Sequence, residues 1–206
     1  MPDALVAGCS IIRNATILDF PLEASVRSVL PGVDDFVLAV GASEDDTRER
    51  AERLAHDEPK VRLLDTVWDT TQGATVLSTQ TNLALAACQA RWALYIQADE
   101  VLADGGALEL RRQLQQADAD ARVEGLVVDY RHFYGGFDMI GVSRQWYRRE
   151  VRAIRLGIGG HSHGDAQGFR VGTEDRRVRC RRSGVTMFHY GWARPTWALQ
   201  AKRRLD

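Results

Sequence analysis

The sequence has few cysteines and no long apolar run, and both absences limit what the protein can be. Its three cysteines, Cys9, Cys88 and Cys180, are far apart and form no CxxC pair. We therefore expect neither a disulfide framework nor a structural zinc site, and we expect a cytoplasmic, reducing location. No apolar stretch approaches the roughly 20 residues that cross a bilayer, and no basic segment leads into an apolar one at the N-terminus. We expect no transmembrane segment, while peripheral membrane contact stays open.

The chain also lacks an excess of charge of one sign, because its formal net charge is -1. The charge is unevenly placed: residues 1–130 hold 11 Lys and Arg against 22 Asp and Glu, whereas residues 131–206 hold 16 against 6. Acids and glycines interrupt the basic half, and it carries no nucleic-acid-binding motif, so we expect no nucleic-acid partner. The basic half could face a diphosphate, or its arginines could be solvated and paired with the acidic half.

The first half of the chain alternates between two kinds of pattern. Four short apolar runs are typical of buried strands, namely residues 5–12, 35–40, 61–64 and 92–96. Four segments have helical spacing or capping residues, namely 22–30, 44–56, 75–90 and 104–116. Such an alternation predicts an α/β fold with a parallel sheet and helices on its faces.

The second half has a different pattern. Residues 125–130 and 185–189 read as strands, and residues 144–154 as an antiparallel strand. Residues 131–141 are aromatic and glycine-rich and predict a loop or hairpin, and the six glycines of residues 157–172 predict a long loop. The 206 residues suit a single domain. We divide it at residue 104, with a smaller antiparallel region in residues 105–206.

Polar residues follow three of the predicted strands. They are Arg13-Asn14, Gly41-Ala42-Ser43 and the run from Gln97 to Glu100. In a parallel sheet, ligands bind beyond the carboxyl ends of the strands. We therefore expect these three clusters to converge on one binding site.

Short blocks along nearly the whole chain resemble the family 2 glycosyltransferases of the GT-A fold. They are SIIRN at 10–14, VGASEDDT at 40–47, QTNLAL at 80–85 and YIQADEV at 95–101. Two further blocks, DAQGFR at 165–170 and HYGWARP at 189–195, resemble one bacterial subgroup of that family. The order and spacing of the blocks carry the resemblance.

The resemblance implies a Rossmann-like, mostly parallel central sheet flanked by helices, with a smaller antiparallel acceptor-side region. It implies transfer of a sugar, with inversion, from a nucleotide-diphospho-sugar donor bound by residues 1–104. The acceptor, bound by residues 105–206, would be a saccharide, a small molecule or a lipid-linked group. The chain ends inside a predicted helix after Pro195, where members of the subgroup continue, so we expect a truncated chain or a short natural form.

Eight residues are expected to bind the nucleotide sugar: Arg13, Asn14, Gln72, Gly73, Asn82, Gln97, Ala98 and Arg149. Arg13 and Asn14 would lie near the base or ribose. For Gln72 and Gly73 the alternative is simple turn chemistry. Arg149 belongs to a set with Arg144, Arg148 and Arg152 whose forks suit diphosphate oxygens, although a solvated basic face is equally consistent with their spacing.

The resemblance also implies a divalent cation, Mg²⁺ or Mn²⁺, which would balance the charge of the departing diphosphate. Asp99 and His189 are its expected ligands. The alternatives are that Asp99 caps the following helix and that His189 is a buried histidine bonded to the backbone. Two positions depart from the family pattern, because Gln97 replaces the first acid of its DxD motif and Val40 replaces an acid that often contacts uracil. We expect the metal to bind weakly until the diphosphate arrives.

An inverting transfer also needs a base near the acceptor hydroxyl. Asp165 is the first candidate, because it lies in a glycine-rich loop of the acceptor-side half, and Glu174 and Asp175 follow. The alternative for all three is an ordinary surface acid. Four aromatic residues could stack on sugar rings or simply pack the core, namely Tyr134, Phe137, Trp146 and Trp192.

Three other functions are alternatives to transfer. The segment His161-Ser162-His163-Gly164-Asp165 has the spacing of a metallohydrolase site, but the histidine usual after the Asp is Ala166. A nucleotidyltransferase would need a glycine-rich phosphate loop after its first strand, which is missing. A catalytically silent module of the same fold, binding a glycan or a partner protein, stays open because of Gln97 and Val40.

Overall fold

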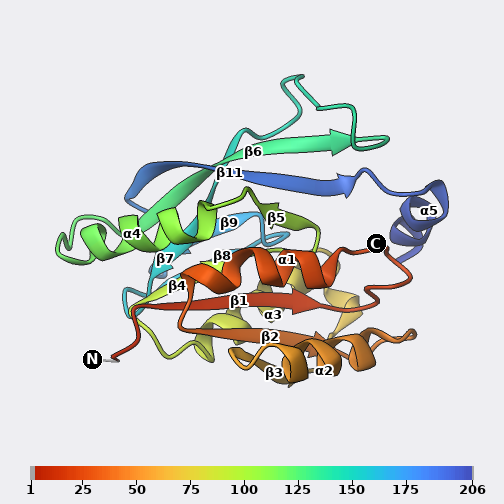
Figure 1. The fold of residues 1–206 in the computed structure, drawn as a ribbon, viewed down its shortest axis with the longest axis horizontal. Coiled ribbons are helices and arrows are strands. Elements are labelled where there is room, and N and C mark those ends of the chain that lie inside the picture. Colours follow the sequence, from red (N-terminus) through yellow and green to blue (C-terminus); the bar gives the residue numbers. More distant parts are fainter. Residues whose placement is uncertain (1–2, 206) are drawn as a thin grey trace.

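The structure, a computed structural model, describes the backbone of residues 3–205 and the side chains of residues 3–201. Eight strands form its main sheet: β1 (Val6–Ile12), β2 (Asp35–Gly41), β3 (Val61–Thr66), β4 (Trp92–Tyr95), β5 (Glu100–Leu102), β6 (Gly125–Tyr134), β7 (Arg149–Arg155) and β11 (Cys180–Trp192). Their order across the sheet is β3-β2-β1-β4-β7-β6-β11-β5 (Figure 1). Three short strands, β8 (Gly160–His163), β9 (Gly168–Val171) and β10 (Arg176–Arg177), make a separate antiparallel sheet.

Parallel pairing joins β3, β2, β1 and β4 on one side of the main sheet, and joins β6 to β11 on the other. Strand β7 is antiparallel to both β4 and β6, so β6 and β11 run in the same direction as β1, β2 and β4. Their carboxyl ends therefore lie along one edge of the sheet (Figure 1). The predicted α/β fold of GT-A type, with a mostly parallel sheet flanked by helices and a small antiparallel region, is confirmed.

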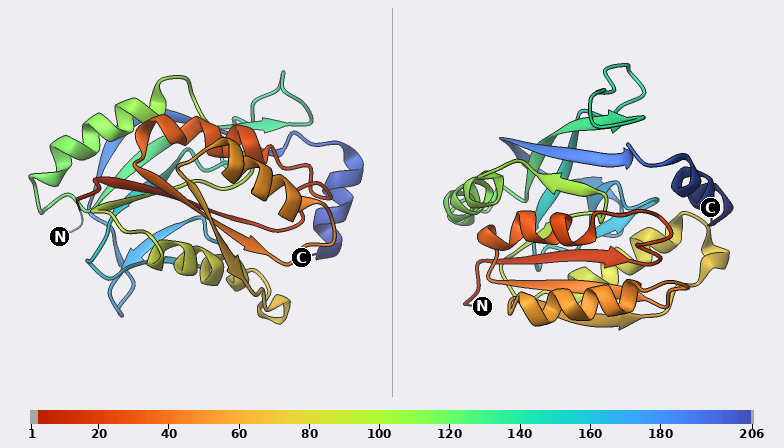
Figure 2. Two further views of the ribbon diagram at one scale, coloured as in Figure 1. Left: turned by 60° about the horizontal axis from the view of Figure 1, so that its bottom comes forward. Right: turned by 45° about the vertical axis from the view of Figure 1, so that its right-hand side comes forward.

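Five α-helices accompany the sheet: α1 (Leu22–Val29), α2 (Thr47–Asp57), α3 (Thr75–Ala86), α4 (Gly106–Asp118) and α5 (Thr196–Leu205). Short 3-10 turns occur at Leu30–Gly32 and Thr70–Gln72. Helices α1, α2 and α4 cover one face of the sheet, and α3 with the small sheet covers the other (Figure 2). In the part of the chain that the structure describes, no helix is long and apolar enough to cross a membrane.

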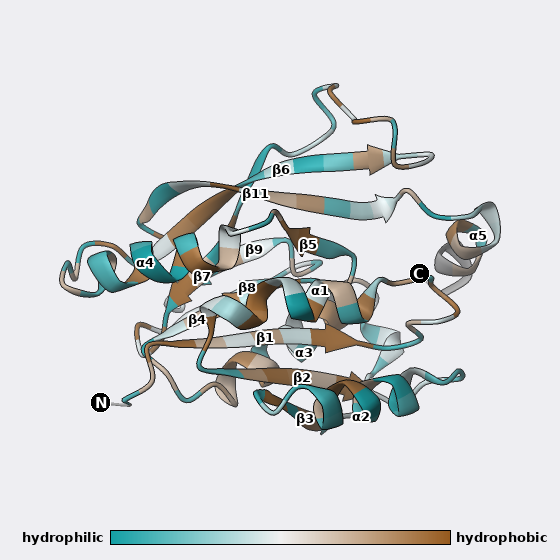
Figure 3. Cartoon of the chain, in the orientation of Figure 1, coloured by the Kyte–Doolittle hydropathy of each residue, from teal (hydrophilic) through white to brown (hydrophobic). Residues whose placement is uncertain are grey.

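The core consists of two layers, because successive side chains of a strand point to opposite faces. In β2, Phe36 and Leu38 pack toward α1 and α2, whereas Val37 and Ala39 pack toward α3. Strand β4 divides in the same way. Strands β1 and β2 are accordingly mostly apolar (largely brown in Figure 3), as expected for parallel strands buried on both faces.

The second half contains more strand than the sequence patterns predict. The glycine-rich segment 157–172 is not one long loop, because it holds the hairpin of β8 and β9. Its glycines form the turns, and Gly157, Gly159, Gly164 and Gly172 all have positive φ angles. Strand β11 starts at Cys180 rather than near 185, since its polar first residues pair with β6. The helix expected from residue 104 begins at Gly106.

Candidate functional site

The segment from Gln97 to Glu100 forms a tight turn directly after β4. The hydroxyl of Ser25, on α1, donates to the carbonyl oxygen of Gln97 at 2.9 Å. The backbone N–H of Gln97 donates to the carboxylate of Glu100 at 3.0 Å, and the N–H of Tyr190 donates to the carbonyl oxygen of Asp99 at 2.8 Å. The turn is thus held by α1, by β11 and by its own acid.

Glu100 points into the core, away from the edge of the sheet. Its carboxylate accepts two hydrogen bonds from Arg152, at 2.6 and 3.1 Å, and one from the hydroxyl of Tyr130 at 2.6 Å. The side chains of Glu100 and Arg152 are both 0% exposed. Burial raises the pKa of the Tyr130 hydroxyl, so this hydroxyl stays a donor. Glu100 and Arg152 therefore fix the turn rather than face a ligand.

Asp99 lies against two residues from the end of β11. Its Oδ2 atom is 2.6 Å from Nη2 of Arg194 and 3.6 Å from Nε2 of His189. Gly191 makes this approach possible, because a Cβ atom there would lie 2.6 Å from Nε2 of His189 and 2.9 Å from Oδ2 of Asp99. The structure thus brings together Asp99 and His189, the two residues expected to bind a metal, and adds a guanidinium to them.

Arg194 is held from several sides. Its Nη1 atom donates to the carbonyl oxygen of Leu18 at 2.8 Å, and its guanidinium carbon lies 4.3 Å from the centre of the Phe20 ring. The side chain is 2% exposed. Its Nε atom is buried and has no hydrogen-bond partner among the residues that the structure describes. A buried donor of this kind is costly unless a ligand or water accepts from it.

His132, on β6, contacts His189 and sets which of its ring nitrogens donates a hydrogen bond. The Nδ1 atoms of the two rings are 2.9 Å apart, and Nε2 of His132 is 2.6 Å from the carbonyl oxygen of Tyr147. A carbonyl oxygen only accepts, so Nε2 of His132 carries the hydrogen. Burial lowers the pKa of His132, and its neutral ring accepts at Nδ1 from His189. This tautomer leaves a lone pair on Nε2 of His189, which faces Asp99.

A divalent cation does not fit this arrangement as it stands. Arg194 already occupies Oδ2 of Asp99. Gln97 is a neutral amide and adds no negative charge, and its Nε2 atom donates to the carbonyl oxygen of Ala166 at 3.4 Å. Within residues 3–205, no group of three His, Cys, Asp or Glu side chains is arranged to hold a metal ion. The binding of Mg²⁺ or Mn²⁺ stays a prediction, and the contacts of Asp99 and Gln97 do not favour it.

The ends of β1 and β2 meet as expected. The Nε atom of Arg13 donates to the carbonyl oxygen of Ala42 at 3.0 Å. The N–H of Asn14 donates to the hydroxyl of Ser43 at 3.0 Å, and its Oδ1 atom accepts from the N–H of Glu44 at 2.9 Å. Asn14 is buried and has a positive φ of 53°. Two of the three predicted polar clusters therefore form one continuous surface.

Several buried polar atoms near this surface have no hydrogen-bond partner within the described part of the chain. They are Asn14 Nδ2, Thr66 Oγ1, Trp68 Nε1 and Gln80 Oε1. Thr66 ends β3, and Gln80 reaches the same place from α3 by donating to the carbonyl oxygen of Val67 at 2.8 Å. The indole of Trp68 lies against Gly41, where a Cβ atom would come within 2.4 Å of it. Unused donors and acceptors thus gather at the ends of β1, β2 and β3.

Three other predicted residues have mixed positions. Gln72 and Gly73 form an exposed turn before α3, in which Gln72 donates to Asp69 at 3.0 Å and Gly73 has a φ of 55°. This is the turn chemistry that was the alternative for both residues. The side chain of Ala98 packs in the core, so only its backbone can meet a ligand at the turn.

Asp165 lies close to the Asp99 turn, and Glu174 does not. Asp165 is exposed, and its neighbour Ala166 accepts the hydrogen bond from Gln97. Glu174 lies in a turn after Gly172, and the N–H of Gly172 donates to the carbonyl oxygen of Gly159. Gly159 follows the end of β7. That end of β7 pairs with the start of β4, whereas Asp99 follows the end of β4. Glu174 is thus at the opposite edge of the sheet, and its expected role as a base is not supported.

Asn82 and Arg149 do not face the Asp99 turn either. The amide of Asn82 bonds to the backbone of Ser162 on β8. Its Oδ1 atom accepts from the N–H of Ser162 at 2.7 Å, and its Nδ2 atom donates to the carbonyl oxygen of Ser162 at 3.1 Å. Arg149 pairs with Asp129 across β6 and β7. Side chains alternate along β6, so Asp129 and Arg149 lie on the face opposite Tyr130 and His132. Asn82 is a structural brace, and Arg149 belongs to the outer surface.

An open cavity lies beside the Asp99 turn. It has a volume of about 530 Å³ and runs between the start of α1 and the ends of β6 and β11. Its lining includes Phe20, Phe133, Phe137, Tyr190 and Arg194. The rings of Phe133 and Tyr190 are stacked with their centres 5.0 Å apart. Of the four aromatic residues expected to meet sugars, only Phe137 lines this cleft. Trp146 instead joins Tyr134, Trp192 and His132 in a neighbouring cluster.

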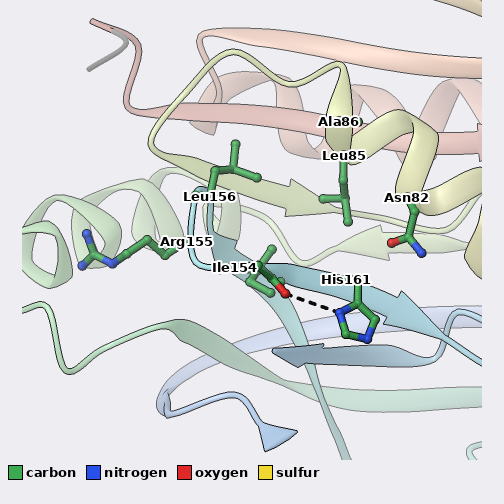
Figure 4. A pocket seen from close by; sticks show the side chains of 10 residues that line it. Asn82, Leu85, Ala86, Ile154, Arg155, Leu156 and His161 are labelled. Carbon is green, nitrogen blue, oxygen red and sulfur yellow. Dashed lines mark hydrogen bonds between the residues drawn. The ribbon is translucent and has the colours of Figure 1, made fainter. Parts of the chain in front are cut away.

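A second cavity, of about 270 Å³, lies where β7 ends, at the opposite edge of the sheet. Figure 4 shows the side chains that line it. Leu85, Ile154 and Leu156 line it, and the ring of His161 stands at its side. His161 interacts with the carbonyl oxygen of Gly159 at 3.4 Å and with Asp175 at 2.7 Å. The HxHxD segment therefore gathers no metal ligands in the described chain.

None of the family profiles compared with the sequence matches it, and no curated protein does. Solved structures that resemble the chain include S. aureus TarS (13% identity, TM-score 0.45), TarS 1-349 (16%, 0.43) and TarS 1-349 in complex with UDP (14%, 0.47). Each match covers 68% of this chain, but only 23% of the first and 38% of the other two. The chain thus spans less than two fifths of these structures, and at such similarity they identify neither its activity nor its substrate.

Sequence reasoning missed His132 and Arg194. No neighbouring residue in the sequence gives His132 a context, and only the pairing of β6 with β11 places it beside His189. Arg194 stands in the HYGWARP block that carried part of the resemblance, but it received no role. The turn after β11 brings it back onto Asp99, a contact between residues 95 positions apart.

Proposed function

We propose that the chain is an inverting glycosyltransferase that uses a nucleotide-diphospho-sugar donor. The observation that carries this proposal is the group of unpartnered buried polar atoms at the carboxyl edge of the sheet, within the described residues. Leaving one such atom unsatisfied costs about 1–3 kcal/mol. Several at one edge, where α/β sheets bind ligands, favour a polar ligand there.

The nucleoside is assigned to the ends of β1, β2 and β3. Asn14 and Trp68 offer unused donors there, and Thr66 and Gln80 offer unused oxygen acceptors. A nucleobase and a ribose present both kinds of partner. Arg13 borders the same surface through its bond to Ala42. The diphosphate then extends toward the turn at Gln97, where Arg194 supplies donors.

The reaction proposed is a single displacement. The oxygen of an acceptor hydroxyl attacks the anomeric carbon from the face opposite the diphosphate. The bond from that carbon to the phosphate oxygen breaks, and its electron pair stays on the oxygen. The carboxylate of Asp165 takes the proton of the hydroxyl. The anomeric configuration inverts, and the nucleoside diphosphate leaves with one more negative charge.

The acceptor is assigned to the cleft beside Arg194. Its aromatic lining, with Phe133 stacked on Tyr190, suits the apolar faces of a saccharide ring or the tail of a lipid-linked acceptor. The loop between β6 and β7 adjoins this cleft through Phe137. Its exposed apolar side chains also make peripheral membrane contact part of the proposal.

A nucleotide-binding experiment tests the proposal. UDP, GDP, TDP and CDP are added separately to the protein, with and without Mn²⁺, and thermal unfolding is followed. At least one is expected to raise the melting temperature. The variant Asn14→Asp, which replaces the unused Nδ2 donor by an acceptor of the same shape, should weaken that shift, and the remote Glu174→Gln should not. A well-folded sample stabilised by none of the four would contradict the proposal.

The second candidate is a catalytically silent module that binds a glycan or a partner protein. Gln97, together with the engagement of Asp99 by Arg194, favours it, because these residues leave little negative charge for a metal. Incubation with UDP-, GDP-, TDP- and CDP-sugars distinguishes the two. Slow hydrolysis of a donor whose nucleotide binds supports the transferase, whereas binding without any hydrolysis supports the silent module.

A further inference from the structure

We infer that Arg194 is the resident cation of the donor site, and that its guanidinium takes the position on Asp99 that a divalent metal would need. The part of Arg194 in transfer rests on the proposed function. The exclusion of a metal from Asp99 rests on the geometry of the ion pair alone, so the two can be tested separately.

The ion pair is short and buried. Nη2 of Arg194 lies 2.6 Å from Oδ2 of Asp99, and their side chains are 2% and 10% exposed. Removing one partner of a buried pair leaves the other charge uncompensated, which is strongly unfavourable. A metal ion that bound Oδ2 would therefore have to displace a buried guanidinium from its carboxylate partner.

The guanidinium is also fixed in direction. Leu18 accepts from its Nη1 atom, and the ring of Phe20 covers one of its faces. Both residues belong to the segment between β1 and α1, so the donor half of the chain positions a residue that follows β11. Donors that are already oriented need no rearrangement when charge develops on a reacting group.

The Nε donor of Arg194 is unused. Its Nε–H is buried without a partner among the described residues, and the residue lines the 530 Å³ cleft. Phosphate oxygens accept strong, charge-assisted hydrogen bonds from guanidinium groups. The unused donor, together with the lone pair on Nε2 of His189, makes this corner ready for a ligand that carries both phosphate oxygens and hydroxyl groups.

The ligands available for a metal are too few. Mg²⁺ and Mn²⁺ prefer oxygen ligands and usually take one or two carboxylates besides phosphates. Here the carboxylate of Glu100 is buried in an ion pair with Arg152, and the side chain of Gln97 is neutral, so neither offers a free carboxylate to a metal. Asp99 with Arg194 already forms a neutral pair. When the bond to the diphosphate breaks, the charge that grows on the leaving oxygen is met by Arg194 donors.

Calorimetry with the nucleoside diphosphate that binds best tests the inference, in EDTA and in Mn²⁺. Wild-type affinity should be the same in both. In EDTA, Arg194→Gln should weaken binding about tenfold to hundredfold, since a hydrogen bond to a charged group contributes about 1.5–3 kcal/mol. Mn²⁺ should restore part of that loss, because Oδ2 of Asp99 and Nε2 of His189 become available. Arg194→Lys, which keeps the charge, guards against misfolding and should lose less.

The matched control is Arg182→Gln, which removes an exposed arginine paired with Asp129 on the far face of β6. It should leave the affinity unchanged in both buffers. A wild-type affinity that rises about tenfold or more with Mn²⁺ would overturn the inference. Equal losses for Arg194→Gln and Arg182→Gln would do the same.

A titration with Mn²⁺ alone, followed by electron paramagnetic resonance, separates this inference from the proposed function. Wild-type protein should bind no Mn²⁺ at Asp99. Binding that Asp99→Asn abolishes would overturn the inference. If no nucleotide binds, the proposed function fails, and this titration still decides whether Arg194 keeps a divalent ion from Asp99.

Discussion

Two acids of the small sheet region allow a matched test at the scale of single residues. Asp165 adjoins the Gln97 turn, whereas Glu174 lies at the opposite edge. Asp165→Asn removes a carboxylate that can take a proton, and a positioned base contributes about a hundredfold or more to the rate. We expect that loss in the transfer rate, measured with the donor and an acceptor found by screening. Glu174→Gln should keep the wild-type rate, and equal losses in both variants would reject Asp165 as the base.

His132 gives a second prediction at this scale, because burial lowers its pKa below the ordinary value of 6.5. The unfolded chain then binds more protons than the folded one, so the contribution of His132 to stability is complete above about pH 6.5 and is lost as the pH falls through the folded pKa. Melting temperatures at about pH 7.5 and about pH 5 should differ less in His132→Gln than in the wild type.

The control for His132 is His56→Gln, since His56 is an exposed residue of α2. It should leave the pH dependence of the melting temperature unchanged. A wild-type difference that persists in full in His132→Gln would show that other groups cause it. Because the imidazole of His132 also orients His189, nucleotide binding by the same variant should be measured alongside.

At the scale of elements, Asn82 joins α3 to β8. Its amide exchanges two hydrogen bonds with the backbone of Ser162, at 2.7 and 3.1 Å. A typical hydrogen bond contributes about 0.5–1.5 kcal/mol, so Asn82→Ala should lower the free energy of unfolding by about 1–3 kcal/mol. Urea denaturation measures this. Thr79→Ala, at an exposed position on the same helix, should change little, and a large loss of nucleotide affinity in Asn82→Ala would restore Asn82 to the binding site.

The elements of the first half were predictable because local patterns determine them. Strand β2, for example, is apolar at every position from Phe36 to Val40, as a strand covered on both faces must be. The second half was harder to predict. Strand β11 starts with the polar run Cys180 to Gly184, which forms a strand because β6 pairs with it. The hairpin of β8 and β9 could not be predicted from the sequence. Its turns are formed by glycines, and a glycine-rich segment is also typical of a loop.

At the scale of the whole molecule, one sheet joins the two predicted halves, since β7 from the second half lies next to β4 from the first. This arrangement explains which site residues the sequence could predict. Arg13, Asn14, Gln97 and Asp99 follow strands of the first half, and the rule for parallel sheets places them at one edge. His132 and Arg194 reach that edge only through strand order and a turn after β11, and neither follows from local pattern.

The loop between β6 and β7 projects from the body of the molecule and leads to the last prediction (Figure 1). It exposes Phe137, Met139, Ile140 and Val142, the last to 78%. Exposed apolar patches of this kind are common at membrane contact sites. Arg144 and Arg148 are exposed within the same loop, and Arg131 is exposed on β6. Each basic residue near an anionic bilayer contributes about 1 kcal/mol.

We therefore expect the protein to sediment with vesicles of phosphatidylcholine and phosphatidylglycerol, and less with phosphatidylcholine alone. The triple variant Phe137→Ser/Met139→Ser/Val142→Ser should lose binding because its loop has no apolar side chains left to insert at those positions. Leu83→Ser/Leu108→Ser removes exposed apolar residues from α3 and α4 and should bind as the wild type does. High salt should weaken binding through the arginines. Equal binding by the triple variant and the wild type would show that this loop is not the contact.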